Sequence, residues 1–433
     1  MNKPICVFTS PIFTRSGYGD WGLAVAKSLQ RYDKFDLHLA PTRWGNCSKK
    51  NLEIDVVDDE EKRLLSRILR GPLPKQPELY IQCTIPNEFQ PVGKYNIGMT
   101  AGIETTICRG EWVEGLNRMD MTVCTSQHAK DVFMKCDFTK NFSDGRKEQL
   151  KVSKPLEVCF WGAETNIYKK TDEKVESLEE VLSKIPEEFA FLFVGQWTSN
   201  GAFHDRKDIG MLIKTFLETF RDKSPKPCLI LKTNGATMSA VDKYECINRI
   251  KEVTSAVTGD DLPNIYILHG ELTDKEMNAL YNHSKVKAHV SFTHGEGYGH
   301  PLLLASLSGK PLMVPQWSGH LDFLNPKFTR YLKGDLVQLP PPAVNDWLIK
   351  ESAWFQVNYA EASEKMKTMY YNYGGSFLAD ADALAKENSQ KYSVEAMDKV
   401  FHALLDKYVP VFAVEQPINL PKLKKIEMPH VIK

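Results

Sequence analysis

A glycine-rich turn with an adjacent carboxylate precedes an apolar helix near residue 300. The turn is Glu296-Gly297-Tyr298-Gly299, and Pro301 falls in the first turn of the helix that follows. Proline suits this position because the N–H that it lacks would have no partner inside the helix. The free backbone N–H groups of such a turn and the positive end of the helix dipole bind phosphate. The spacing therefore predicts an anion-binding loop, although the geometry alone is equally compatible with a turn that serves packing.

The stretch that begins at this turn resembles the signature of the retaining glycosyltransferase family 4. The family pattern continues with an apolar helix, a Gly-Lys-Pro element and a Ser-Gly pair, matched here by Ser308–Pro311 and by Ser318-Gly319. Members of this family have the GT-B fold and use nucleotide-diphosphate sugars as donors. The resemblance implies that Glu296 faces the donor sugar. It also implies that Gly297–Gly299, together with Ser318 and Gly319, bind the donor.

A pair of adjacent cations, Arg206 and Lys207, precedes a helical pattern that starts at Ile209. By the same resemblance, Lys207 takes the place of the family lysine, with Arg206 beside it. Cations are needed there because the leaving group is a nucleoside diphosphate, whose developing charge must be stabilised. In the absence of a bound anion, these two cations would be unfavourable at a helix N-terminus, because the helix dipole is positive there. The family arginine is replaced by Gln196 in this chain, and Lys232 is the candidate substitute.

Two further observations concern the nucleoside part of the donor. The loop His269–Thr273 matches the family loop whose backbone pairs with the nucleobase, which places Leu272 in the donor site. The glutamate that commonly holds the donor ribose, eight positions after Glu296, is Leu304 in this chain. A leucine cannot accept hydrogen bonds from ribose hydroxyls. This contact is therefore lost or supplied from elsewhere, and the donor nucleotide stays open.

The first half of the chain offers fewer chemical groups. Gly17 and Gly19 lie in a loop between an apolar run and a helix. The resemblance places the donor phosphate and the acceptor close to the backbone of this loop, and such an approach favours glycine. Glu104 is the polar candidate for the acceptor side and joins Glu296, Lys207 and Arg206 as the fourth catalytic candidate. Many relatives carry a histidine near the reacting sugar, which this chain lacks, and His128 is expected at the surface.

Two patterns could hold a metal. Asp380-Ala381-Asp382 matches the DxD signature through which the other major glycosyltransferase fold binds Mg²⁺ or Mn²⁺. It lies in a helical, alanine-rich stretch and not at a strand end, so we expect solvated aspartates. His289, His294 and His300 flank the glycine-rich turn, but spacings of five and six do not put three imidazoles on one helix face. No metal site is expected.

Apolar runs alternate with amphipathic helical patterns along the chain. The runs that predict buried strands are Ile5–Phe8, Leu79–Gln82, Tyr95–Met99, Met121–Cys124 and Leu156–Phe160, then Phe189–Val194, Cys228–Leu231, Asn264–Leu268, Val286–Phe292 and Pro311–Val314. Between them, Ile209–Phe220 shows the 3–4 spacing of a helix with one buried face, and Thr273 with Glu276 forms a capping box. Two series of alternating strands and helices predict two α/β domains with parallel sheets.

The expected fold class is α/β and, by the resemblance, GT-B. This fold has two facing Rossmann-like domains and a C-terminal helix that crosses back to the first domain. We expect an acceptor-side domain at residues 1–162, a nucleotide-sugar domain at 163–393, and a crossing helix with an extended tail at 394–433. The first boundary lies where Gly162 and a polar run break the periodicity. The crossing helix is expected at Val394–Tyr408.

Composition limits where the protein works and what it binds. The 433 residues include 55 basic and 55 acidic ones, so there is no general attraction to nucleic acid or anionic membranes. No run reaches the roughly 18 apolar residues of a membrane span. Nine cysteines without a CxxC pair, in a chain whose first residues lack a secretory signal, indicate reduced thiols. We therefore expect a cytoplasmic protein without stable membrane insertion.

Together the patterns and the resemblance predict a glycosyltransferase that needs no metal or other cofactor, and the resemblance implies that it retains the anomeric configuration. The nucleotide sugar is the donor, and the acceptor stays open: a glycan, a small molecule, a protein or a hydroxymethylated base in phage-type DNA. Zero net charge weighs against DNA, for which a basic face is expected. A sugar-phosphate enzyme or a nucleotide-sugar-binding module without transferase activity is the alternative of another class.

Overall fold

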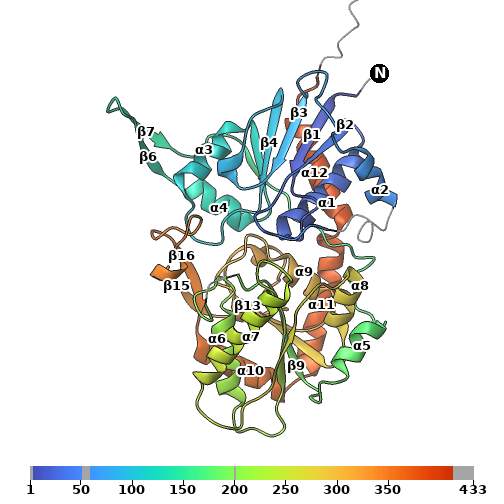
Figure 1. Cartoon of the computed structure of the whole chain (residues 1–433), viewed down its shortest axis with the longest axis vertical. Helices are drawn as coiled ribbons and strands as arrows, with labels where there is room; N and C mark the ends of the chain where they lie inside the picture. The colour runs from blue at the N-terminus through green and yellow to red at the C-terminus, as the bar shows by residue number, and fades with distance from the viewer. Residues whose placement is uncertain (1–2, 51–58, 199–200, 413–433) are drawn as a thin grey trace, which may run out of the picture.

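The chain folds into two α/β domains that stack along the long axis of the molecule (Figure 1). The computed structural model describes residues 3–50, 59–198 and 201–412. Each domain contains a six-stranded sheet. The predicted extended tail lies outside the described residues from position 413 onward.

The first sheet consists of parallel strands in the order β2-β1-β3-β4-β5-β8. Its strands are β1 (Ile5–Ser10), β2 (Asp36–Pro41), β3 (Leu79–Cys83), β4 (Tyr95–Thr100), β5 (Met121–Cys124) and β8 (Leu156–Val158). The helices of this domain are α1 (Gly17–Tyr32), α2 (Asp59–Ser66), η1 (Pro86–Glu88), α3 (Gly110–Arg118) and α4 (Gln127–Lys135). An antiparallel hairpin, β6 (Phe138–Asn141) and β7 (Lys147–Leu150), projects from the domain (Figure 1).

The second sheet is also parallel, in the order β11-β10-β9-β12-β13-β14. Its strands are β9 (Ala190–Val194), β10 (Cys228–Lys232), β11 (Ile265–Leu268), β12 (Val286–Val290), β13 (Leu312–Pro315) and β14 (Arg330–Leu332). The helices are α5 (Glu176–Leu182), α6 (Ile209–Phe220), α7 (Ala240–Ser255), α8 (Asp274–Asn282), α9 (His300–Ser306), η2 (Gly319–Asp322), α10 (Tyr359–Tyr371) and α11 (Gly375–Lys391). An antiparallel ribbon, β15 (Gly334–Gln338) and β16 (Ala353–Val357), encloses η3 (Pro341–Ala343).

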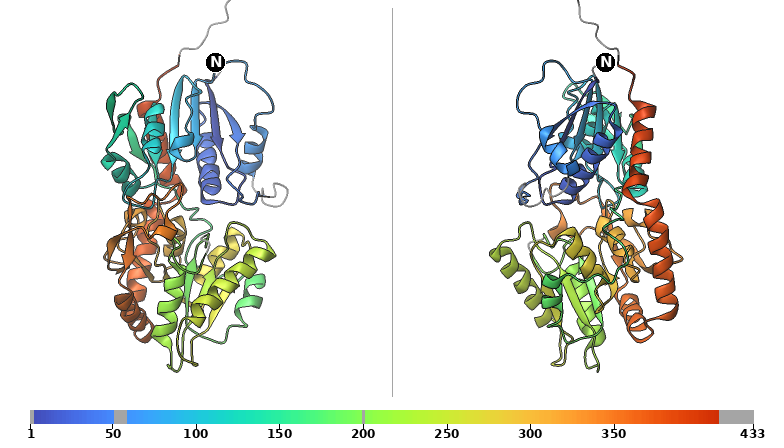
Figure 2. Two further views of the ribbon diagram at one scale, coloured as in Figure 1. Left: turned by 60° about the vertical axis from the view of Figure 1, so that its left-hand side comes forward. Right: turned by 90° about the vertical axis from the view of Figure 1, so that its right-hand side faces the viewer.

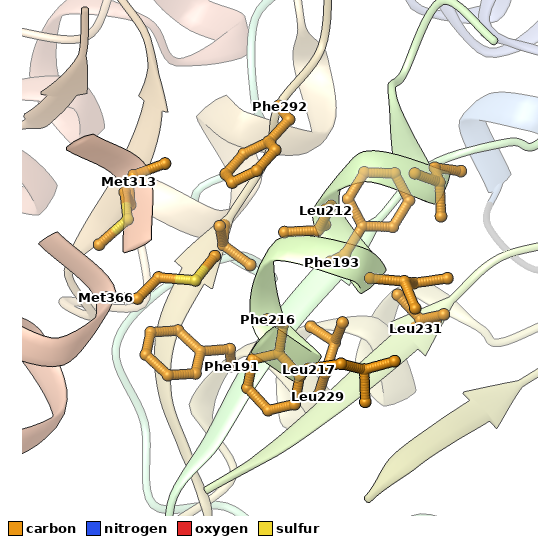
Figure 3. Close-up of a cluster of buried hydrophobic side chains, with 14 of the residues drawn as sticks. Phe191, Phe193, Leu212, Phe216, Leu217, Leu229, Leu231, Phe292, Met313 and Met366 are labelled. Carbon is orange, nitrogen blue, oxygen red and sulfur yellow. The ribbon is translucent and has the colours of Figure 1, made fainter. Parts of the chain in front are cut away.

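Helix α6 shows how the apolar spacing builds the core of the second domain. The residues spaced three and four apart on its inner face, Leu212 and Phe216 among them, are fully buried. They pack on Phe191 and Phe193 of β9 (Figure 3). Complete burial of a side chain of this size contributes roughly 1.5–3 kcal/mol. The predicted helix Ile209–Phe220 is thus confirmed, and it fixes the position of the residues that precede it.

The chain passes between the domains twice, at neighbouring places. The backbone N–H of Ala163 donates to the Tyr392 carbonyl at 2.8 Å, and that of Val394 donates to the Ala163 carbonyl at 3.0 Å. Beyond this point α12 (Val394–Tyr408) inserts Met397 and Phe401 into the core of the first domain. Figure 2 shows this helix lying along the first domain, as the predicted fold class requires.

Within the two six-stranded sheets, the strands that sequence patterns missed lie at the edges. β2 forms one edge of the first sheet and alternates between exposed and buried positions, so it gives no continuous apolar run. β14 forms an edge of the second sheet and has three residues. In the part of the chain that the structure describes, no helix is long and apolar enough to cross a membrane.

Candidate functional site

Loops that follow the parallel strands of both sheets meet between the domains. The glycine-rich turn comes after β12 and leads into α9, and Gly299 caps this helix with a φ of 90°. From the first domain, the segment after β4 and the segment after β5 approach it. Parallel sheets bind ligands at the carboxyl ends of their strands, so this junction is where a ligand site is expected.

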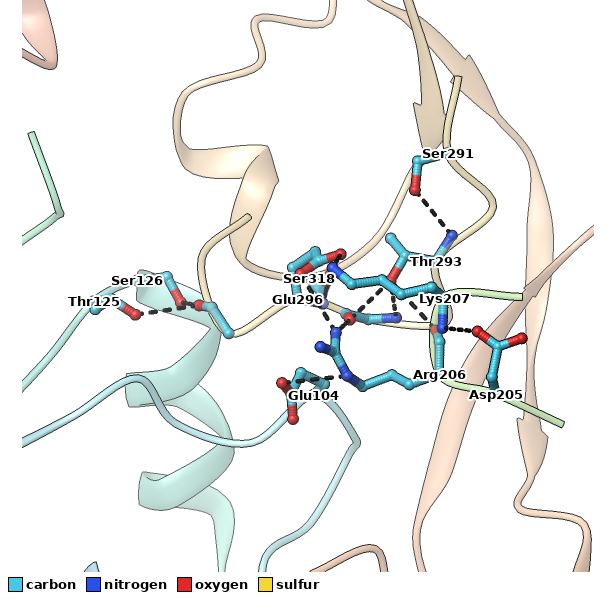
Figure 4. Close-up of polar contacts among 12 residues, drawn as sticks. Glu104, Thr125, Ser126, Asp205, Arg206, Lys207, Ser291, Thr293, Glu296 and Ser318 are labelled. Atoms are coloured by element: carbon cyan, nitrogen blue, oxygen red, sulfur yellow. Dashed lines mark hydrogen bonds and ion pairs between the residues drawn. The ribbon is translucent and has the colours of Figure 1, made fainter. Parts of the chain in front are cut away.

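Two glycines allow the turn to touch the first domain. A Cβ on Gly295 would lie 2.1 Å from the Glu104 carbonyl oxygen, and one on Gly297 would lie 2.5 Å from that of Ala101. Atoms cannot approach this closely, so only glycine fits at either position. The hydroxyl of Ser126 also donates to the Gly297 carbonyl at 2.5 Å (Figure 4). The turn is therefore held against the first domain through its backbone.

Four charged side chains from the two domains form a cluster beside this turn (Figure 4). Lys207 Nζ lies 2.5 Å from Glu296 Oε1, and Arg206 Nη1 lies 3.4 Å from Glu296 Oε2. Arg206 also reaches across the cleft, with its Nε 3.4 Å from Glu104 Oε1. Burial raises the pKa of Glu296, but Lys207 and Arg206 outweigh this effect and hold the pKa at about 2. The four predicted catalytic residues are thus brought together, and Glu296 is ionised at neutral pH.

A buried aspartate fixes the backbone that carries the two cations. Asp205 Oδ1 accepts a hydrogen bond from the Lys207 N–H at 2.9 Å, and its Oδ2 accepts one from Ile209 at 3.1 Å. Burial raises the pKa of Asp205 to about 6, although these two bonds oppose the shift. The carboxylate thereby satisfies an N–H at the start of α6, where helices have unpaired donors. Arg206 and Lys207 can therefore lie just before a helix N-terminus, because the carboxylates of Asp205 and Glu296 both lie close to them.

Ser318 and Gly319 support the turn from the second domain. Ser318 Oγ accepts a hydrogen bond from the Glu296 N–H at 2.9 Å, and the Gly319 N–H donates to the Glu296 carbonyl at 2.9 Å. A Cβ on Gly319 would lie 2.2 Å from the Gly297 carbonyl oxygen. Both residues were predicted as donor-binding. The structure places them against the backbone of Glu296, so their visible role is to position this residue.

Tyr298 turns its side chain away from the cleft. The ring is 4% exposed and packs in the core of the second domain, with its centroid 5.0 Å from that of Phe323. Its hydroxyl has no hydrogen-bond partner among the described residues. Any contact of Tyr298 with a donor therefore comes from its backbone.

The predicted glycine loop of the first domain lies at the start of α1. Ser16 caps this helix by accepting a hydrogen bond from the Gly19 N–H at 3.0 Å. A Cβ on Gly19 would lie 2.2 Å from the Thr14 carbonyl oxygen, whereas Gly17 has open space around it. Tyr18 accepts a hydrogen bond from the N–H of Ala101 at 2.9 Å. The loop is therefore tied to the segment that meets the glycine-rich turn.

Lys232 supports the predicted nucleobase loop. Its ammonium donates to the Gly270 carbonyl at 2.7 Å, and burial lowers its pKa. In the same loop, Glu271 pairs with Arg15 of the first domain at 2.5 Å, a contact that sequence patterns did not indicate. Leu272 packs against the core of the second domain. Lys232 thus holds the loop in place from the end of β10.

His128 was expected at the surface, and this prediction is wrong. The ring is half-buried between the domains and lies edge-on to Trp317, with 4.7 Å between the ring centroids. Burial lowers the pKa of His128 to about 4, so the imidazole is neutral at pH 7. Its partner is far along the sequence, on the segment after β13, and no local pattern around His128 predicts the contact.

The three histidines near the turn have separate partners. His289 lies 3.3 Å from the Ser308 hydroxyl, His294 stacks on Trp354 with 3.9 Å between ring centroids, and His300 stacks on Trp161 at 3.5 Å. The two aspartates of the DxD sequence lie on α11. Asp380 pairs with Arg330 at 2.5 Å and Asp382 with Lys170 at 2.6 Å. Within the described ranges, no group of three or more histidine, cysteine or acidic residues could hold a metal ion.

Two facing Rossmann-like domains, joined by a C-terminal helix that returns to the first, define the GT-B fold. The predicted fold class is confirmed by similarity to solved structures over almost the entire chain. A glycosyltransferase from Rickettsia africae has a TM-score of 0.60 and 11% identity, with 94% of this chain and 99% of that one covered.

Two further solved structures show the same likeness. HepE from Anabaena, in complex with UDP and glucose, has a TM-score of 0.58 and 11% identity over 93% of this chain and 100% of its own. Sucrose-phosphate synthase from Thermosynechococcus elongatus has a TM-score of 0.57 and 11% identity over 94% and 99%. No family model and no curated protein sequence matches the chain. At these identities the likeness establishes the fold.

Proposed function

We propose that the protein is a glycosyltransferase that moves a sugar from a nucleotide-diphosphate sugar to a hydroxyl acceptor. The observation that carries this proposal is the cluster of Lys207, Arg206 and Glu296 beside the glycine-rich turn, between the two domains. Fold similarity supports it, since the similar structures include a glycosyltransferase, a UDP and glucose complex, and a sucrose-phosphate synthase. The sequence resemblance to the retaining glycosyltransferase family 4 points the same way.

Each part of the cluster has a role in this proposal. Lys207 and Arg206 bind the diphosphate and stabilise the charge that develops on it as the sugar leaves. The backbone N–H groups of Gly297–Gly299 add neutral donors. Helix α9 has only seven residues, so the cations contribute more to this binding than its dipole. Glu296 stays ionised and accepts hydrogen bonds from hydroxyls of the donor sugar.

The reaction proposed is the one that the resemblance to the retaining family implies, and the groups of the cluster are compatible with it. The bond between the anomeric carbon and the phosphate oxygen breaks, and the acceptor oxygen bonds to the same face of the sugar. The acceptor proton passes to the departing phosphate, so no separate protein base is required. A carboxylate with a pKa of about 2 that is paired with two cations is a poor proton acceptor. Lys207 and Arg206 take the place of a divalent cation in balancing the leaving group.

The test starts with UDP-glucose, because HepE was solved with UDP-glucose. Release of UDP by the full chain is measured with this donor and with a panel of other nucleotide sugars. Lys207→Met and Glu296→Gln should abolish release, whereas Lys214→Met, on helix α6 and outside the cluster, should not. The anomeric proton of a transferred product, observed by NMR, reports retention or inversion. Failure to bind any nucleotide sugar would refute the proposal, and binding without turnover would favour a binding module.

A further inference from the structure

A cavity of about 300 Å³ lies between the domains beside the ribbon β15–β16. Its volume is at the lower end of small-molecule sites, which span about 300–1,000 Å³. The first domain and the second domain both contribute to its lining: Asn87, Arg109, Glu111 and Trp112 from the first, Asp346 and Trp347 from the second. None of these residues belongs to the donor cluster described above.

Two chain segments, one from each domain, run from the cavity to the donor cluster. On the first domain, Arg109 follows Glu104 by five residues, so their Cα atoms lie at most about 18 Å apart. On the second domain, Ala353 at the start of β16 exchanges two hydrogen bonds with Thr106, both at 2.9 Å. Two residues further on, the Phe355 N–H donates to the His294 carbonyl, beside the glycine-rich turn, at 3.0 Å. These segments fix the cavity close to the donor cluster.

An indole stands at the mouth of this cavity on a fixed turn. Trp347 is 45% exposed. Asn345 Oδ1 accepts hydrogen bonds from the N–H groups of Trp347 at 2.8 Å and Leu348 at 2.9 Å. From the opposite domain, Arg109 Nη1 donates to the Asp346 carbonyl at 2.8 Å. These hydrogen bonds fix the turn at both ends. Binding of a ligand to the Trp347 ring therefore does not require a mobile loop to become ordered, which would reduce the binding free energy.

Two residues that line the cavity have buried polar atoms without partners. Asn87 Oδ1, an acceptor, and Trp112 Nε1, a donor, have no hydrogen-bond partner among the described residues. Buried polar groups of folded proteins are usually paired, and those left over call for an explanation. Both atoms are enclosed by protein, and a ligand hydroxyl would reach them only after a local shift of the side chains.

We infer that this cavity binds a sugar unit of the acceptor, which makes the acceptor a glycan. The C–H groups of a pyranose ring pack on the electron-rich face of an indole, and its hydroxyls can hydrogen-bond with the polar side chains of the lining, Asn87, Arg109 and Asp346 among them. Arg109 pairs with Glu111 at 3.4 Å, and Asp346 adds a second carboxylate. The lining is therefore slightly acidic and does not favour a phosphate-bearing ligand such as DNA. The acceptor role, though not the sugar binding itself, rests on the function proposed above.

The experiment uses the full chain and an array of defined α- and β-linked oligosaccharides as probes. The best glycan on the array is then titrated by calorimetry against the wild type and two variants. Trp347→Ala should weaken its binding tenfold or more, since truncation of a central tryptophan removes much of the contact surface. Tyr244→Ala, which truncates a 63% exposed aromatic ring on α7, should leave it unchanged. Neither substitution should alter the affinity for UDP.

The outcomes separate this inference from the proposed function. Glycan binding that is equally strong in Trp347→Ala overturns the inference, as does an array on which no glycan binds. Preferential binding of duplex DNA at the expense of glycans also overturns it. If no nucleotide sugar binds while glycan binding still depends on Trp347, the proposed transferase function fails and the sugar-binding cavity stands.

Discussion

Replacing Lys207 with methionine removes the cation closest to Glu296 and keeps the length of the side chain. Burial raises the pKa of Glu296, but its cationic partners hold it at about 2, against an ordinary 4.5. At about 1.4 kcal/mol per pH unit, this difference corresponds to about 3 kcal/mol of stabilisation at neutral pH. Burial also lowers the pKa of Lys207, so the cost of burying the ammonium offsets part of the gain. Because Arg206 remains 3.4 Å from the carboxylate, we expect the free energy of unfolding to fall by about 1–3 kcal/mol.

The size of this loss should depend on pH. A carboxylate with a depressed pKa stabilises the folded state above its unfolded pKa, and the stabilisation disappears as the pH falls through the folded value. For Glu296 the stabilisation is lost as the pH falls from 4.5 to about 2. Urea unfolding at pH 7 and pH 3 should therefore show a difference between wild type and Lys207→Met that is less than half as large at pH 3. Equal differences at both values would refute the electrostatic explanation.

Nucleotide binding by the same variant tests the diphosphate assignment. A charge-assisted hydrogen bond contributes roughly 1.5–3 kcal/mol, so affinity for the nucleoside diphosphate should fall about tenfold to a hundredfold. Calorimetric titration measures this loss. Lys214→Met, which removes a cation from the helix that follows Lys207, serves as the matched control and should change stability by less than about 0.5 kcal/mol. Wild-type affinity in Lys207→Met would place the diphosphate elsewhere.

Three further changes probe the rest of the site. Gly297→Ala places a Cβ 2.5 Å from the Ala101 carbonyl oxygen, so sugar transfer should fall more than tenfold; a fully active variant would show that this contact is not needed. Leu304→Glu should fold normally, because this side chain is only partly buried, and should leave nucleotide affinity unchanged or tighter by calorimetry. A strongly lowered Tm would instead mean that the leucine is essential to the core. Activity should survive exhaustive EDTA treatment, and Asp380→Asn with Asp382→Asn should alter it little, because both carboxylates pair with cations on the second domain; a complete loss restored only by Mn²⁺ would contradict this.

The parts of the fold that sequence predicted are those with a local signal. Helix α6 has an apolar spacing that is visible within twelve residues, and Thr273 with Glu276 forms the capping box expected from their separation. The edge strand β2 was missed because half of its residues face solvent, so its pattern resembles a loop. The ribbon β15–β16 was missed for a related reason, since two strands that pair only with each other need no long apolar run.

The same distinction applies to the site. Glu296 and Lys207 were predicted from their neighbours in sequence, and the structure brings them together. Contacts between the domains could not be predicted this way, because each joins segments that are distant in the chain. The ion pair of Arg15 with Glu271 is one example, and the packing of His128 on Trp317 is another. These contacts depend on how two complete domains meet.

Helix α12, the last helix in the described part of the chain, completes the first domain, and this affects the order in which the protein folds. Met397, Phe401 and Leu405 of α12 fill the core beneath β1 and α1, which lie near the other end of the chain. During synthesis, all strands of the second domain have left the ribosome before these residues do. At that point the core of the first domain still lacks the side chains of α12. Domains generally fold as units from the N-terminus onward. Here the domain that is synthesised first becomes complete after the second, and part of its apolar surface stays uncovered until α12 has been synthesised.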